Sequence, residues 1–112
     1  MPEAGEDVFG VLADPTRRRI LDLLVEHEVL SVSQLAAEFP DLVASGISKH
    51  LMALRAAGLV TAAREGRNQL YRIDAGGFAR ALGPWLAKYE AYWSGSLEAL
   101  RILAETPEPD QE

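Results

Sequence analysis

The 112-residue sequence contains no cysteine and only two histidines. Without cysteine the chain forms no disulfide, no thiol redox sensor and no thiolate metal site. A usable zinc site needs about three or four converging N, S or O ligands, and His27 and His50 fall in different predicted helices. Only a weak carboxylate site remains open to a metal, so we expect no metal and no cofactor.

Long apolar runs are also lacking. None approaches the ~18–20 residues that a membrane span requires. Residues 1–7 have neither the basic flank nor the apolar stretch of a signal peptide. These absences predict a cytoplasmic protein that does not bind a membrane.

Catalytic motifs are missing as well. The chain has no hydrolase elbow, no phosphate-binding loop and no spacing that pairs a histidine with a nucleophile. Ser48 and His50 are neighbours on one predicted helix and do not form part of a triad. We therefore expect no enzyme activity.

Basic side chains are few, 11 against 17 acidic ones, and the net charge of −6 argues at first sight against a nucleic-acid partner. Their distribution changes this interpretation. Residues 45–72 carry five basic side chains and one acidic one. By contrast, residues 1–44 carry three basic and nine acidic side chains, and residues 73–112 carry three basic and seven acidic ones. One contiguous positive segment between two acidic flanks is typical of a surface that binds a DNA backbone.

Length and composition fit one globular domain, with 48% hydrophobic and 25% charged residues. Residues 106–112 contain two prolines, three acids and no apolar side chain. We expect residues 1–5 to be flexible, residues 6–105 to form the domain, and residues 106–112 to form a disordered tail.

Two helix starts are marked by capping residues. A short apolar segment at 6–12 precedes Asp14 and Pro15, which are a preferred N-cap and first helical residue. Ser31 and Gln34 have the spacing of a capping box and begin a second, short helix. The first of these helices is predicted to bury Ile20, Leu23, Leu24 and His27.

The next segment, 44–57, reads as a helix that buries Ile47, Leu51 and Leu54, and Gly58 ends it. Strands at 59–61 and 69–73 then flank a turn at 65–68. A Gly-Gly pair at 76–77 and a Gly-Pro pair at 83–84 precede a last helix. From 85 to 105 it has no breaker except Gly95, so we expect one helix of about 30 Å. This order predicts a mainly α fold with a small β-hairpin, a winged helix-turn-helix with a long C-terminal dimerisation helix.

The outer side of helix 44–57 and the hairpin are the candidate DNA-binding surface. A second helix held across a short turn is the geometry that places a recognition helix in a major groove. The same residues would also fit an ordinary solvated face, an interpretation that the basic hairpin weakens. The candidate contacts are Ser45, Ser48, Lys49, His50, Met52, Arg55, Arg64, Arg67, Asn68 and Gln69.

Arg17, Arg18 and Arg19 lie in the first turn of a predicted helix, where the helix dipole disfavours cations. They either contact DNA phosphates or, in the case of Arg18, form an ion-pair ladder with Asp14 and Asp22 at i, i+4 spacing. We favour the ladder for Arg18 and leave the other two open.

The last helix carries an apolar stripe larger than a core of this size can cover. Such a stripe favours pairing with a second copy of the chain, and the alternative is a pocket for an aromatic or lipid-like effector. The stripe consists of Leu82, Leu86, Tyr89, Trp93, Leu97, Leu100 and Ala104.

Several segments together resemble the ArsR/SmtB-type bacterial transcriptional repressors. They are FGVLADPTRRRIL at 9–21, SGISKHL at 45–51, LRAAGLV at 54–60, REGR at 64–67 and LYRI at 70–73. The Trp-Leu pair at 85–86, with Tyr89 and the Tyr-Trp pair at 92–93, is similar to a metal-independent branch of that family. The family's metal sensors have a cysteine pair before the turn or a histidine–carboxylate set in the last helix, and this chain has neither.

The resemblance implies a homodimer built from the first and last helices, which adds Phe9 to the dimer interface, and a wing that includes Tyr71. It also implies a repressor that binds a palindromic operator. A winged-helix module for protein association, without an operator, is the alternative. The sequence names no effector.

Overall fold

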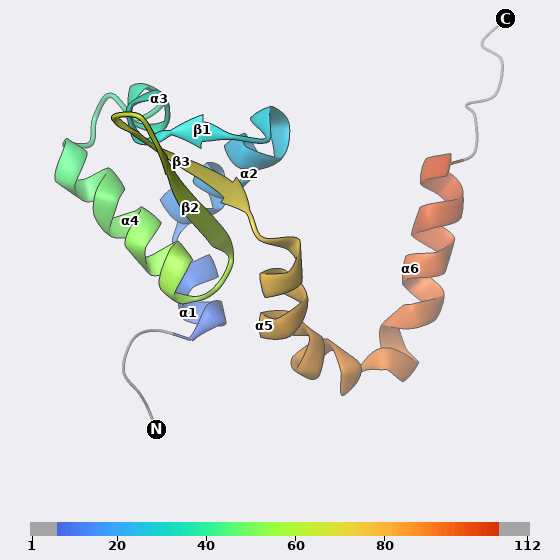
Figure 1. The fold of residues 1–112 in the computed structure, drawn as a ribbon. Coiled ribbons are helices and arrows are strands. Elements are labelled where there is room, and N and C mark those ends of the chain that lie inside the picture. Colours follow the sequence, from blue (N-terminus) through green and yellow to red (C-terminus); the bar gives the residue numbers. More distant parts are fainter. Residues whose placement is uncertain (1–6, 106–112) are drawn as a thin grey trace, which may run out of the picture. The chain divides into compact units, whose positions relative to one another are not determined.

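The computed structural model describes residues 7–105 (Figure 1). They form two compact units, one up to Leu82 and one from Gly83. The first contains α1 (Val8–Leu12), α2 (Pro15–His27), β1 (Leu30–Ser31), α3 (Val32–Ala37), α4 (Ala44–Ala56), β2 (Val60–Glu65) and β3 (Asn68–Ile73). Helix α5 (Ala75–Ala87) continues into the second, which also contains α6 (Glu90–Glu105). The predicted fold class is confirmed, and no helix within 7–105 is long and apolar enough to cross a membrane.

Both predicted capping motifs begin helices. The Asp14 carboxylate accepts hydrogen bonds from the backbone N–H groups of Thr16, at 2.8 Å, and Arg17, at 3.3 Å. The Ser31 hydroxyl accepts from the Gln34 backbone at 3.1 Å, and the Gln34 side chain accepts from the Ser31 backbone at 2.8 Å. The first turns of α2 and α3 therefore have partners for N–H groups that a helix leaves unpaired.

The core of the first unit lies where α2, α3 and α4 meet the sheet. Its fully buried side chains are Val11, Ile20, Leu23, Leu24, Leu35, Ile47, Leu51, Leu54 and Leu59. The predicted burial of His27 is wrong. His27 is the last residue of α2, its side chain is 53% exposed, and it lies 3.6 Å from the Glu26 carboxylate. Leu21, which is 7% exposed, contributes to the core instead.

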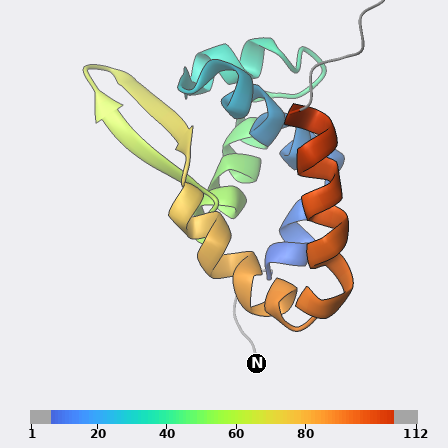
Figure 2. The ribbon, with the colours of Figure 1, turned by 90° about the vertical axis from the view of Figure 1, so that its right-hand side faces the viewer.

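The sheet has three antiparallel strands in the order β1-β3-β2. The third strand, β1, was not predicted, because two residues are too short to show an alternating pattern. The hairpin turn is tighter than predicted: Glu65 pairs with Asn68, and only Gly66 and Arg67 lie between the strands. Gly66 has a φ of 63°, which suits the first position of a two-residue hairpin turn. Figure 2 shows this hairpin protruding from the helices of the first unit, α3 and α4 among them.

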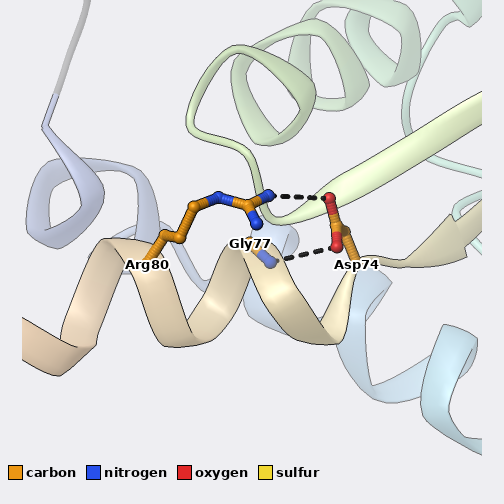
Figure 3. Close-up of polar contacts among 3 residues, drawn as sticks. All are labelled: Asp74, Gly77 and Arg80. Atoms are coloured by element: carbon orange, nitrogen blue, oxygen red, sulfur yellow. Dashed lines mark hydrogen bonds and ion pairs between the residues drawn. The ribbon is translucent and has the colours of Figure 1, made fainter.

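The end of α4 and the start of α5 are in direct contact. Gly58, with a φ of 82°, ends α4, and the Leu59 N–H donates to the Leu54 carbonyl at 3.0 Å, as in a Schellman motif. The Asp74 N–H then donates to the Leu59 carbonyl at 2.9 Å, and its carboxylate accepts from the Gly77 N–H at 3.0 Å (Figure 3). Asp74 therefore joins the two helices.

The C-terminal helices begin and end at different residues from those predicted. The glycines at 76–77 and the Gly-Pro pair at 83–84 lie inside α5, because Asp74 caps that helix. The prediction of one unbroken helix from 85 to 105 is wrong, since α5 ends at Ala87 and α6 begins at Glu90. At the break, the Leu86 carbonyl accepts from the Tyr89 N–H at 3.0 Å and from the Trp93 indole at 2.7 Å.

Gly77 packs so closely that a side chain does not fit. A Cβ atom at this position would lie 1.6 Å from the Gly58 carbonyl oxygen, which is backbone and has little freedom to move. We expect Gly77→Ala to lower the free energy of unfolding by about 2–3 kcal/mol, measured by urea denaturation at one fixed protein concentration.

The matched control is Gly95→Ala inside α6, where the next residue is not a proline and a Cβ would meet no other part of the structure within 4 Å. Because alanine favours helix, this variant should be neutral or stabilised by up to about 1 kcal/mol. Equal stability of the two variants would contradict the close approach of Gly77 to Gly58.

Candidate nucleic-acid interface

Helix α4 has a buried side and an exposed side. Ile47, Leu51 and Leu54 are each 0% exposed, and a helix turns about 100° per residue, so their burial fixes its rotation. The opposite side is open to solvent and consists of Ser45, Ser48, Lys49, Met52 and Arg55. The structure therefore brings together on one surface five of the six candidate contacts predicted on this helix.

The N-terminus of α4 has no side-chain cap. Its N-cap residue is Val43, whose side chain accepts no hydrogen bond. The positive end of the helix dipole, with the exposed Ser45 in the first turn, is therefore left open to an anion. Helix α4 begins at Ala44, as the sequence predicts.

The hairpin contributes a second group of exposed side chains. Arg64, Arg67 and Asn68 are exposed and Gln69 is half-buried. Tyr71 does not belong to this group: it is 7% exposed and packs in the core. Successive strand residues point to opposite faces of a sheet, and Tyr71 of β3 faces inward between Leu30 and Ala62 of the neighbouring strands.

A hollow of about 450 Å³ connects the tip of the hairpin with the helix-turn-helix. The sequence did not identify its residues on α3, of which Ser33 is exposed and polar. The only signal for Ser33 was its place just after the capping residue Ser31. The hollow is lined by Ser31, Val32, Ser33, Ala36, Ala44, Arg67, Asn68 and Gln69.

The three arginines at the start of α2 have different environments. Arg17 Nε donates a hydrogen bond to His50 Nδ1 at 3.0 Å, which links α2 to α4. Arg18 Nη1 donates to the Leu12 carbonyl at 2.7 Å, so the predicted ion-pair ladder through Arg18 is wrong. Arg19 is exposed. His50 thus lies at the margin of the candidate surface and is held from a second helix.

Apolar side chains predicted to pair two chains are exposed in both units. Phe9 of α1 is 44% exposed, and Leu86, Tyr89 and Leu97 are 39%, 45% and 51% exposed. Leu82 and Trp93 are half-buried, and the side chain of Leu100 lies outside the described part of the structure. The Trp85 and Tyr89 rings contact each other in a tilted arrangement, with centroids 5.3 Å apart. Exposed aromatic surface of this kind is typical of an interaction site.

No group of three or more histidine, aspartate or glutamate side chains within residues 7–105 could hold a metal ion. The polar side chains of the candidate surface are hydroxyls, amides and cations. These groups donate hydrogen bonds to phosphate oxygens and to base edges.

The fold and this surface define a winged helix-turn-helix domain of the kind that binds DNA. Residues 12–62 match a family described as a helix-turn-helix domain. The chain is 49% identical over 72 residues to the transcriptional regulator CmtR of Mycobacterium tuberculosis, a match that covers 64% of this chain and 59% of CmtR. The chain thus spans less than two thirds of the length of that curated relative.

Two solved structures resemble the chain over most of their lengths. An ArsR family transcriptional regulator, RHA00566, is 34% identical, with a TM-score of 0.64 over 77% of this chain and 86% of its own. The homodimeric winged helix-turn-helix DNA-binding domain of Mb0332 from Mycobacterium bovis is 32% identical, with a TM-score of 0.57 over 78% of this chain and 92% of its own. The chain belongs to the ArsR family of transcriptional regulators, a class without enzyme activity.

The burial of Tyr71 predicts a structural role for its ring. Tyr71→Ala should lower the free energy of unfolding by about 3–5 kcal/mol, the cost of removing a buried aromatic ring. Tyr71→Phe keeps the ring and should cost less than about 1.5 kcal/mol. Urea denaturation measures both.

Met52→Ala is the control for truncation of a large side chain, because Met52 is 67% exposed. Its effect should stay within about 0.5 kcal/mol. A Tyr71→Ala variant as stable as Met52→Ala would mean that Tyr71 is not part of the core.

Proposed function

We propose that the protein is a homodimeric repressor that binds a palindromic operator in the cytoplasm. One observation carries the proposal: the exposed side of α4, with Ser45, Ser48 and Lys49, lies opposite a fully buried stripe. The exposed arginines of the hairpin belong to the same short positive segment of the chain. A rigidly held face of hydroxyls and cations suits insertion into a major groove.

The contacts divide by chemistry. Lys49, Arg64 and Arg67 carry full charges and would bind phosphates, which gives affinity and makes it dependent on salt. The short side chains of Ser45 and Ser48 lie on the same side of α4 as Lys49 and would read base edges. Arg67, at the hairpin turn, would make its phosphate contact at the edge of the minor groove beside the recognition site, where the negative potential attracts arginine.

Self-association is supported by the exposed apolar side chains of α1, α5 and α6, among them Phe9, Leu86 and Leu97. The similar domain from Mycobacterium bovis is described as a homodimer. Two copies would place two recognition helices in successive major grooves about 34 Å apart, which requires a two-fold symmetric operator.

The decisive experiment is sequencing of the genomic DNA fragments that the purified protein selects at physiological salt. The proposal predicts enrichment of a palindrome in a promoter region, including that of the protein's own gene. Recovery of fragments without a shared sequence would contradict it and would favour the alternative of a winged-helix module for protein association.

Single cations of the candidate surface should matter for affinity. Lys49→Ala and Arg67→Ala should each weaken binding to the selected fragment by about tenfold in a gel-shift titration. Each should also lower the slope of log affinity against log salt by about 1, since one phosphate contact is lost.

Lys88→Ala is the control, because it removes the same charge from an exposed residue between α5 and α6. Its affinity should stay within about twofold of the wild type, since long-range effects of one exposed charge are screened by salt. If all three variants bind alike, the assignment of contacts to α4 and the hairpin is wrong.

A charge placed in the apolar stripe should separate the two copies. Leu97 of α6 is 51% exposed, and Leu97→Glu would bury an unpaired carboxylate in the proposed interface. We expect a monomer by analytical ultracentrifugation, and a loss of affinity for the selected fragment of about 100-fold or more, since one half-site is then bound alone.

Ala91→Glu, at an exposed position on the other side of α6, is the matched control and should remain a dimer with unchanged affinity. A dimeric Leu97→Glu variant would exclude this part of α6 from the interface.

A further inference from the structure

The hydrogen bond between Arg17 and His50 joins residues that are 33 positions apart in the sequence. Arg17 Nε lies 3.0 Å from His50 Nδ1, and both side chains are half-buried. Arg17 belongs to the first turn of α2, and His50 to the middle of α4. The contact therefore ties the proposed recognition helix to a helix outside the helix-turn-helix.

This contact determines the tautomer of the histidine. A guanidinium N–H can only donate, so His50 Nδ1 must be the unprotonated, accepting nitrogen of a neutral ring. The ring proton then resides on Nε2, which becomes a donor. Within residues 7–105 the ring makes its one hydrogen bond with Arg17, so the protein there supplies no acceptor for the Nε2 proton.

The position of Arg17 has an electrostatic cost. A cation in the first turn of a helix opposes the helix dipole, and the backbone N–H groups of Thr16 and Arg17 are already capped by Asp14. The Nε2 donor of His50 is therefore the group that calls for an acceptor outside residues 7–105.

The location of His50 on α4 selects the kind of acceptor. His50 is half-buried, whereas Ser48 and Lys49 beside it are exposed. Side chains at the centre of a helix face in the major groove meet base edges, and side chains at its margin meet the sugar–phosphate walls. This marginal position suits a phosphate oxygen as the acceptor better than a base edge.

We propose that Arg17 is a positioning residue for His50, holding the imidazole as the tautomer with its proton on Nε2 so that it donates to a phosphate of the operator. This inference rests on the proposed function, since it requires operator DNA. It assigns to α2 a part in DNA binding that the recognition helix and the hairpin do not supply.

The tautomer is measured by long-range ¹H–¹⁵N NMR of the histidine rings in the full-length protein, at a pH at which the imidazole is neutral. We expect the wild type to show the tautomer protonated at Nε2 for His50, and Arg17→Ala to show a mixture of the two tautomers. His27 lies beside Glu26 and, within residues 7–105, pairs with no arginine, so it serves as the internal reference. A mixture in the wild type would overturn the proposal.

Affinity for the fragment recovered by genomic selection tests the second part of the proposal, the contribution of Arg17 and His50 to DNA binding. Arg17→Ala should weaken binding about tenfold more than Arg19→Ala, because Arg19 has the same charge in the same turn and only Arg17 bonds to His50. Equal losses in the two variants, with the wild type still selective, would overturn the proposal and leave the proposed function intact. A wild-type protein that selects no fragment would overturn the proposed function itself.

Two near-isosteres of histidine separate positioning from mere charge. A glutamine amide places its N–H near the position of Nε2, whereas an asparagine amide reaches only the position of Nδ1. His50→Gln should retain affinity within about threefold, and in that background Arg17→Ala should cost no more than Arg19→Ala. His50→Asn should lose affinity about tenfold.

Thermal unfolding of every variant identifies any loss of affinity that is due to folding. A His50→Gln variant that binds as weakly as His50→Asn would contradict a donor at Nε2.

Discussion

The burial of one apolar stripe on α4 determines how the candidate surface is presented. Ile47, Leu51 and Leu54 have no exposed surface, so the helix has one rotation relative to the core. Burying three such side chains contributes several kcal/mol, on the order of 1.5–3 kcal/mol each. A rotation that exposed Leu51 would cost much of this free energy and would turn Ser48 and Lys49 inward. The same contacts that stabilise the domain therefore orient the side chains that face DNA.

Elements with a strong local signal were predictable from the sequence. The capping pairs at the starts of α2 and α3, the buried stripe of α4 and the glycine that ends it are short-range patterns, and all are present in the structure. The features that could not be predicted depend on contacts between distant residues. Strand β1 is defined only by its pairing with β3. From the sequence alone, the glycines at 76–77 resemble a helix breaker. In the structure they lie in the first turn of α5, because Asp74 caps this turn and Gly77 packs against the backbone of Gly58.

The candidate site also contains residues that the local sequence pattern predicts and residues that depend on tertiary contacts. Exposure of Ser45, Ser48 and Lys49 follows from helical periodicity and needs no tertiary information. The direction of Tyr71 does not, because a strand of six residues with half-buried neighbours on both faces gives no clear alternation. The contact of Arg17 with His50 was equally hidden: the sequence left the role of Arg17 open, and the structure brings His50 to it from another helix.

The close approach of Gly77 to Gly58 has a mechanical consequence. Two backbones meet there without a side chain between them, and Asp74 bonds to both sides, to the Leu59 carbonyl and to the first turn of α5. Side chains at helix contacts normally absorb small shifts by changing rotamer, and here no rotamer is available to do so. The exit of α4 and the first turn of α5 therefore move as one body, a stiff joint through which displacement of either helix reaches the other.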